Sequence, residues 1–124
     1  MPAYYYADFQ HLVDFEPADL SAEKTERLME AALGLLNLYG AEIPEPSGTY
    51  GSKAFSMEAS QWSALVLVTR MFYIDFLEEG SGEFTLQGVE VKARDYLKNP
   101  AVVAQIMDLA NKARPGDYDN IKLV

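Results

Sequence analysis

The side chains that could carry out chemistry are few in this chain. It has one histidine, His11, which lies near Asp8 and Asp14 in a stretch that we expect to be helical. A metal site built on imidazole normally needs a second histidine, or a cluster of carboxylates beside the first. A solvated polar helix face is therefore the better interpretation of these three residues.

The other reactive groups and motifs also give no indication of a catalytic or metal site. The chain has no cysteine, which excludes disulfides, thiolate zinc sites and cysteine nucleophiles together. It contains no G-x-S-x-G nucleophile elbow, no P-loop and no dinucleotide fingerprint. Glu78, Glu79 and Glu83 are close in sequence, but a helix end beside a glycine loop normally exposes such groups to water. We expect no catalytic site, no cofactor and no metal.

The charge balance restricts the partners of the chain. Its 10 basic and 19 acidic residues give a net charge of −9, which repels phosphate and excludes a basic nucleic-acid-binding patch. Solubility is the simplest reason for the acidity. Two alternatives explain the acidity: adaptation to high salt, or a negatively charged surface that DNA passes without binding.

No targeting segment or membrane span is expected. The first six residues lack a basic stretch followed by an apolar run. The longest apolar run, Ala64–Val68, is far shorter than the roughly 20 residues that a membrane span requires. We expect a protein that resides inside the cell or in a virion.

The segments that carry the side chains discussed above are expected to be mainly helical. The spacing of apolar residues predicts a short helix over Ala7–Phe15 and an amphipathic helix that begins after Ser21, its N-cap, and ends at Gly40. The apolar stripes consist of Phe9, Leu12 and Val13 in the first helix, and Leu28, Met29, Ala32, Leu33, Leu35, Leu36 and Tyr39 in the second. Glu26 and its charged neighbours are placed mostly outside that stripe.

A loop over Ala41–Phe55 follows, with two prolines and two glycines. Its length is near the upper end of ordinary connections, which favours a role beyond joining helices. Packing on a neighbouring subunit and a passive surface position are both open interpretations.

The central feature is a long helix over Met57–Glu79, with Ser56 as its expected N-cap. Its wide apolar stripe is assigned to the core of the subunit: Trp62, Leu65, Val66, Thr69, Phe72, Tyr73 and Phe76. Leu67, Met71 and Ile74 lie on a different face. A helix that is apolar on almost every side must be covered on every side, so part of this second face is the candidate subunit interface. Met71→Glu is expected to disturb assembly or folding.

Two charged residues interrupt the central helix. Arg70 and Asp75 are five positions apart and do not share a face. Each is expected to meet a partner from elsewhere, either inside the monomer or across an interface.

The remainder is expected to be less regular. Gly82–Val91 breaks the helical period and predicts short extended pieces or a hairpin, and Lys92–Lys98 predicts one or two helical turns. A last helix begins at Asn99-Pro100 and ends before Pro115-Gly116. The fold class is therefore mainly α: a small bundle of about four helices around a long central apolar helix, with an extended or hairpin excursion after it. Residues 1–114 form one domain, and residues 115–124 form a C-terminal tail.

The order of these parts resembles the head–tail adaptor (connector) proteins of tailed bacteriophages and tailed archaeal viruses. The resemblance rests on architecture over most of the chain, with the long apolar helix through Gln61–Tyr73 at its centre and no diagnostic motif. It implies a ring of identical subunits, typically twelve, between the portal and the tail. Such a ring extends the DNA channel, contacts the portal protein and the next tail or stopper protein, and lets double-stranded DNA pass without specific binding.

The same resemblance implies a location at the head–tail junction of a virion, in a protein made in the host cytoplasm. It also implies that Arg114–Val124 reaches the portal, which makes the tail residues Tyr118, Ile121, Leu123 and Val124 candidates for portal docking. A frayed end is the alternative for this tail. The competing function is a small acidic protein-binding module or regulator without catalytic activity.

Overall fold

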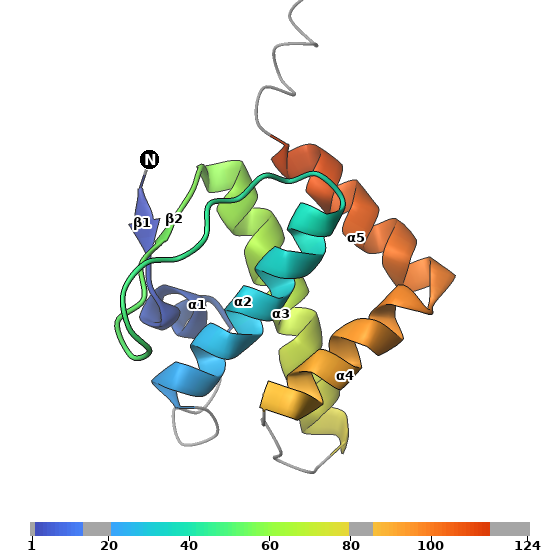
Figure 1. Cartoon of the computed structure of the whole chain (residues 1–124), viewed down its shortest axis with the longest axis horizontal. Coiled ribbons are helices and arrows are strands. Elements are labelled where there is room, and N and C mark those ends of the chain that lie inside the picture. Colours follow the sequence, from blue (N-terminus) through green and yellow to red (C-terminus); the bar gives the residue numbers. More distant parts are fainter. Residues whose placement is uncertain (1, 14–20, 80–85, 115–124) are drawn as a thin grey trace, which may run out of the picture.

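Helix α3 runs through the middle of the molecule, with α2 crossing in front of it and α5 beside it (Figure 1). This computed structural model describes residues 2–13, 21–79 and 86–114. The described elements are β1 (Ala3–Tyr4), α1 (Tyr6–Val13), α2 (Ala22–Leu38), β2 (Phe55–Ser56), α3 (Ala59–Glu79), α4 (Leu86–Leu97) and α5 (Pro100–Ala113). The prediction of a mainly helical bundle around a long central helix is confirmed.

Both predicted ends of α2 are confirmed by their hydrogen bonds. The Ser21 hydroxyl oxygen accepts a hydrogen bond from the Lys24 amide at 3.2 Å, as an N-cap does. At the other end the Ala41 amide donates to the Leu36 carbonyl, and the Gly40 amide donates to the Asn37 carbonyl. This pair of bonds is the Schellman arrangement, and Gly40 has the φ of +94° that the arrangement requires.

The start of α3 differs from the prediction. Ser56 is not its N-cap, because it lies in β2 and pairs with Ala3 of β1. The helix begins three residues later, at Ala59. The side-chain oxygen of Gln61 accepts a hydrogen bond from the Glu58 amide at 2.9 Å, which is half of a capping box. Glu58 is therefore the residue that precedes the first helical turn.

The two short strands attach the N-terminal segment to the beginning of α3. β1 and β2 are antiparallel, and the Pro2 carbonyl accepts a hydrogen bond from the Met57 amide at 3.1 Å. The Tyr4 ring stacks on the Trp62 ring with 4.2 Å between centroids and 3° between planes. Because these contacts bring Tyr4 onto Trp62, the buried end of α3 is covered by the N-terminal segment.

The helix after α3 is longer than the sequence predicted, because the helical turns expected over Lys92–Lys98 belong to a helix that begins at Leu86. The expectation of extended structure over Gly82–Val91 is wrong for its described part, since Leu86–Leu97 is the single helix α4. Residues 80–85 lie outside the described part of the chain. Val89 and Tyr96 are both buried, seven positions apart, with Ala93 half-buried between them. That spacing places both residues on one side of a helix, and their burial outweighs the preference of the valines for strands.

The last helix begins where the sequence predicted it. The Asn99 side-chain oxygen accepts hydrogen bonds from the Ala101 and Val102 amides, and Pro100 occupies the first helical position. Ile106, Ala110 and Ala113 are the buried residues of α5. They recur every three or four residues, so one face of the helix is directed at the core.

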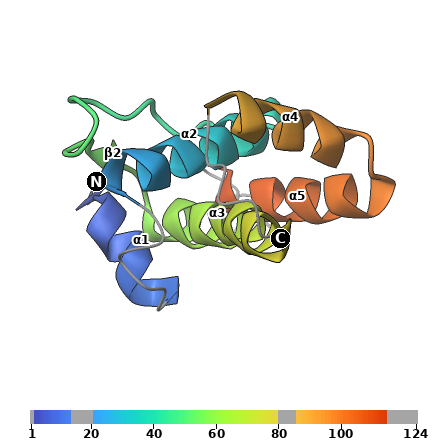
Figure 2. The ribbon, with the colours of Figure 1, turned by 90° about the horizontal axis from the view of Figure 1, so that it is seen from below.

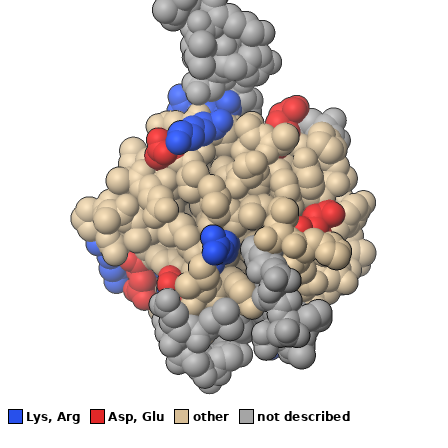
Figure 3. Space-filling model, turned by 180° about the vertical axis from the view of Figure 1, so that it is seen from behind, with Lys and Arg blue, Asp and Glu red and all other residues tan. Residues whose placement is uncertain are grey.

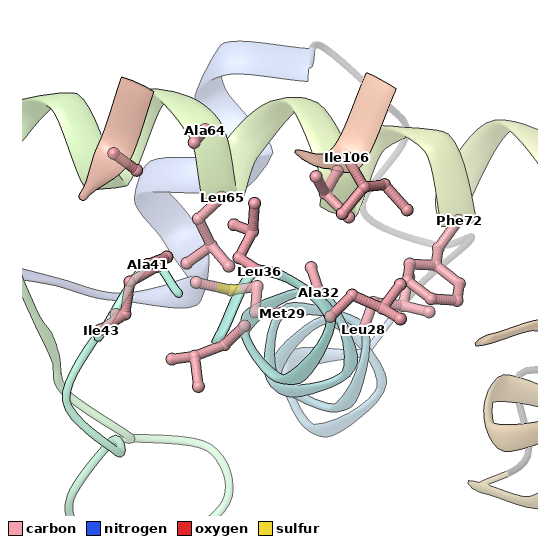
Figure 4. Packing of buried hydrophobic residues seen from close by; sticks show 14 of the residues in the cluster. Leu28, Met29, Ala32, Leu36, Ala41, Ile43, Ala64, Leu65, Phe72 and Ile106 are labelled. Atoms are coloured by element: carbon pink, nitrogen blue, oxygen red, sulfur yellow. The ribbon is translucent and has the colours of Figure 1, made fainter. Parts of the chain in front are cut away.

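The core lies between α2, α3 and α5. Figure 4 shows Leu28, Ala32 and Leu36 of α2 facing Leu65 and Phe72 of α3, with Ile106 of α5 closing the cluster. Ala41 and Ile43, from the loop after α2, are buried at its edge. In the described part of the chain no helix is long and apolar enough to cross a membrane.

Candidate functional site

Most of the circumference of α3 is covered inside the domain. The residues of its predicted core stripe are buried except Val66, which is half-buried, and Val68 is buried as well. α2 and α5 supply the largest part of the covering. The expectation that another chain must cover part of this helix therefore applies to one narrow strip, because most of its other described side chains are buried or half-buried.

We name this strip the α3 face: Ser60, Ser63, Leu67 and Arg70, with half-buried Met71 and Ile74 at its edge. Its members recur every three or four residues, as one side of a helix requires. The three predicted interface residues do lie together here, but they differ in exposure. Leu67 is 46% exposed, whereas Met71 packs against the hydrophobic core. Leu67 is therefore the residue of the three that a partner can reach without any change in the core.

The surface around the α3 face has few charges. Seen from behind, the molecule shows a broad area with few charged side chains over α3, with α1 and α5 to its sides (Figure 3). Of the described side chains of α3, Arg70 is the exposed charged one. In a chain with a net charge of −9, so wide an area with little charge makes this surface the candidate for contact with another protein.

A second set of polar residues lies between α2 and the loop after it. We name it the Tyr50 cluster: Arg27, Glu30, Tyr50 and Lys53. The Glu30 carboxylate accepts hydrogen bonds from the Tyr50 hydroxyl at 2.6 Å and from the Lys53 ammonium at 2.7 Å. Arg27 and Lys53 each lie 4.3 Å from the centroid of the Tyr50 ring, within the range of a cation–π interaction. The ring is thus held by two cations while its hydroxyl is held by a carboxylate.

The Glu26 carboxylate of α2 binds the backbone of the same loop. Its side chain is fully buried, and its two carboxylate oxygens accept hydrogen bonds from the Gly51 amide at 2.5 Å and the Lys53 amide at 2.9 Å. A buried carboxylate is costly unless such donors satisfy it. Asn37 of α2 also binds the loop, since its side-chain amide forms two hydrogen bonds with the backbone of Ile43. The loop is therefore fixed to α2 of its own subunit by side-chain hydrogen bonds.

This arrangement was not predicted from the sequence, although a signal for it is present. Glu26 is adjacent to charged residues that were expected outside the apolar stripe. It is three residues before Met29 and seven before Leu33, so it shares their side of the helix. A glutamate at that spacing, followed by a long glycine-containing loop, is a candidate for a buried carboxylate that binds backbone amides.

The Tyr50 cluster makes stability sensitive to high pH. The hydrogen bond to Glu30 raises the pKa of Tyr50 above its ordinary 10.0, and the same carboxylate raises the pKa of Lys53 above 10.5. With both pKa values raised by folding, the native state binds more protons than the unfolded state at high pH. The stabilisation is complete below pH 10.0 and is lost as the pH rises through the folded values.

We therefore expect the melting temperature of the wild type to fall more steeply above pH 10.0 than that of Tyr50→Phe. The variant keeps the ring between the two cations but has no hydroxyl to ionise. Thermal unfolding followed by circular dichroism from about pH 7 to about pH 11 measures the two slopes, since this range runs from about three units below to about one unit above the pKa of a typical tyrosine. Parallel curves would show that the hydroxyl contributes nothing to the pH dependence.

The other polar residues form no reactive constellation in the described part of the chain. His11 and Asp8 are exposed, and Asp8 uses a carboxylate oxygen to accept a hydrogen bond from the Tyr5 amide. No group of three or more histidine, aspartate or glutamate side chains there is placed to hold a metal ion. Asp75 meets its expected partner inside the monomer, where the Tyr96 hydroxyl of α4 donates to it. Arg70 is exposed instead.

The candidate portal-docking residues Tyr118, Ile121, Leu123 and Val124 lie outside the described residues, as do the side chains of Glu78, Glu79 and Glu83. Comparison of the chain with protein-family models, with curated proteins and with solved structures gave no match.

Proposed function

We propose that this chain is a structural protein of a tailed virus, an adaptor that forms a ring between the portal and the tail and extends the DNA channel. One observation carries the proposal: α3 has a nearly uncharged outer face in a chain whose net charge is −9. Copies with that charge repel one another over most of their surfaces. The α3 face is where a second copy can approach with the least repulsion and the least burial of unpaired charge.

The order of the elements supports the same class of protein. A short helix, an amphipathic helix, a loop containing proline and glycine, a long apolar helix and a final helix follow one another in the order on which the resemblance to the head–tail adaptors rests, with helix α4 in the place of the expected extended excursion. The loop is held rigidly to its own subunit, which suits a component of a fixed assembly. The acidic composition suits a channel through which DNA passes without being held.

In this role the partners of the chain are other copies of itself, the portal protein above and the next tail or stopper protein below. The ring is twelve-fold by resemblance to the adaptors. The protein is made in the host cytoplasm and resides at the head–tail junction of the virion. No cofactor, metal or membrane takes part.

Leu67→Glu tests the proposal because it places a carboxylate in the centre of the α3 face. We expect the wild type to assemble at high protein concentration and high salt, where screening reduces the mutual repulsion. We expect Leu67→Glu to stay at the monomer mass of 13.8 kDa under the same conditions. Light scattering coupled to size-exclusion chromatography measures both masses.

Val91→Glu is the matched control, since Val91 of α4 is 45% exposed against 46% for Leu67. It adds the same charge to a comparable position on another helix, so it should assemble as the wild type does. A wild type that remains monomeric at every salt and protein concentration would contradict the proposal and favour the small acidic binding module. Assembly of Leu67→Glu at wild-type strength would remove the α3 face from the interface.

A further inference from the structure

The loop after α2 ends in a tip that is exposed and yet fixed. We name residues 47–52 the loop tip. Its base is closed by two hydrogen bonds between the backbones of Ser47 and Ala54, at 3.0 and 2.8 Å. All six residues of the tip are exposed. They are serine, glycine, threonine and tyrosine, so the tip has no charged side chain.

Several contacts fix the shape of this tip. Gly48 and Gly51 adopt φ values of +99° and +102°, and the Ser52 amide donates to the Thr49 carbonyl at 3.0 Å. Glu26 and Glu30 bind it from α2. A surface that is already ordered loses little conformational entropy on binding, and tyrosine with serine and glycine is a composition that many protein-binding loops use. The tip therefore has the properties of a recognition element.

The loop tip and the α3 face lie on different sides of the molecule. Glu26 and Glu30 bind the tip to one side of α2, while Leu28 and Ala32 pack against α3 on another side. Figure 2 shows the loop along the upper edge of the molecule, α2 below it and α3 along the lower edge. A two-fold dimer uses one surface twice, whereas a ring needs two different surfaces on different sides of each subunit.

The charges of the two surfaces are compatible. Arg70 is the exposed charge of the α3 face, and it is positive. The loop tip has no charged side chain of its own, and the Arg27, Lys53 and Glu30 side chains that contact its Tyr50 are half-buried. The residue two positions before the tip, Glu45, is exposed and negative. Contact between the two would bury few charges and would bring opposite charges together at its rim. Two copies of the α3 face would instead bring Arg70 of one copy near Arg70 of the other.

We propose that the loop tip of one copy docks on the α3 face of the next copy, so that the subunits assemble head to tail. This inference rests on the proposed function and specifies the second surface that a ring requires. Glu26 and the Tyr50 cluster then have a role in assembly, because they hold the tip in the shape that the neighbouring copy meets.

Mixing two complementary variants tests the inference. Leu67→Glu damages the α3 face, and Thr49→Glu damages the loop tip; both positions are exposed, so both variants should keep the fold and melting temperature of the wild type. Each variant alone should be a monomer of 13.8 kDa, since every contact needs one surface of each kind. An equimolar mixture has one intact tip and one intact face, so it should form a dimer of twice that mass and nothing larger.

Each other outcome has a definite meaning. A wild type that never assembles overturns the proposed function and this inference together. A wild type that assembles, with Thr49→Glu assembling equally well, overturns the inference and leaves the α3 face in place. Two monomeric variants that do not dimerise on mixing also overturn it, because the contact then uses one surface twice. Val91→Glu mixed with the wild type should assemble fully and controls for added charge.

Discussion

Replacing Glu26 with alanine is expected to lower the free energy of unfolding by about 3 kcal/mol or more. The substitution removes two hydrogen bonds from backbone amides to a charged group, each worth about 1.5–3 kcal/mol. It also leaves the Gly51 and Lys53 amides without the acceptor that they have in the native structure. Domains of ordinary size are stable by only about 5–15 kcal/mol, so this one side chain accounts for a large share.

Two further variants show whether stability depends on the buried hydrogen bonds of Glu26 or only on the loss of a negative charge from α2. Glu26→Gln has one carbonyl oxygen and an amide that cannot accept, so it can satisfy one of the two backbone donors and should lose about half as much. Glu23→Ala removes a glutamate that is 56% exposed on the same helix and should change stability by less than about 0.5 kcal/mol.

Urea unfolding gives the three free energies, and amide hydrogen exchange by NMR locates the damage. In Glu26→Ala we expect Gly51 and Lys53 to exchange much faster than the amides of α3. A loss below about 1 kcal/mol, with both amides still protected, would show that Glu26 does not hold the loop.

The second large effect is expected at Phe72. Its side chain is fully buried between α3 and α2, close to Leu28 (Figure 4). Its ring lies 4.9 Å from the ring of Tyr96 of α4. Phe72→Ala should lower the free energy of unfolding by about 3–5 kcal/mol, through lost apolar burial and the cavity that remains. Phe72→Leu, which keeps most of the volume, should cost less than half as much.

Leu67→Ala is the matched control for Phe72→Ala on the same helix. The Leu67 side chain is exposed, so its truncation should change stability by less than about 0.5 kcal/mol. Urea unfolding of the three variants measures the contrast between the two sides of α3. Equal losses for Phe72→Ala and Leu67→Ala would contradict the assignment of one side to the core and the other to the surface.

Predictions based on local chemistry succeeded where local contacts decide the structure. Ser21, Gly40 and Asn99 act within one helical turn of their own positions, so their residue types alone indicate where α2 begins and ends and where α5 begins. The predicted start of α3 was wrong because a long-range contact decides it. Ser56 is a good N-cap by type, but pairing with Ala3 from the far end of the sequence places it in a strand.

Segment 86–97 shows how burial overrides local preference. Two valines and a glycine suggested extended structure, because β-branched residues favour strands. Val89 and Tyr96 must both reach the core, and they can do so from one helix because they are two turns apart. The sequence contained that spacing, but which residues the core would accept depends on α2 and α5.

The candidate interface could be predicted only in part. The sequence correctly placed Leu67, Met71 and Ile74 on a side of α3 away from the core stripe, since helical spacing alone decides this. It could not tell that Met71 packs against the core while Leu67 reaches solvent, because that depends on which neighbours cover the edge of the strip. For the same reason the hydrogen bonds from the loop to Glu26 and Glu30, which join residues 20 or more positions apart, were not predicted.

The stacking of Tyr4 on Trp62 gives the molecule an optical reporter. Trp62 is the single tryptophan of the chain, so the indole emission comes from one known place. Because the Tyr4 ring lies against it at 4.2 Å, that emission responds to detachment of the N-terminal strand as well as to global unfolding. Far-ultraviolet ellipticity, which follows the helices, does not sense the strand alone. Recording both signals during one titration therefore distinguishes release of the N-terminal strand from loss of the helical core.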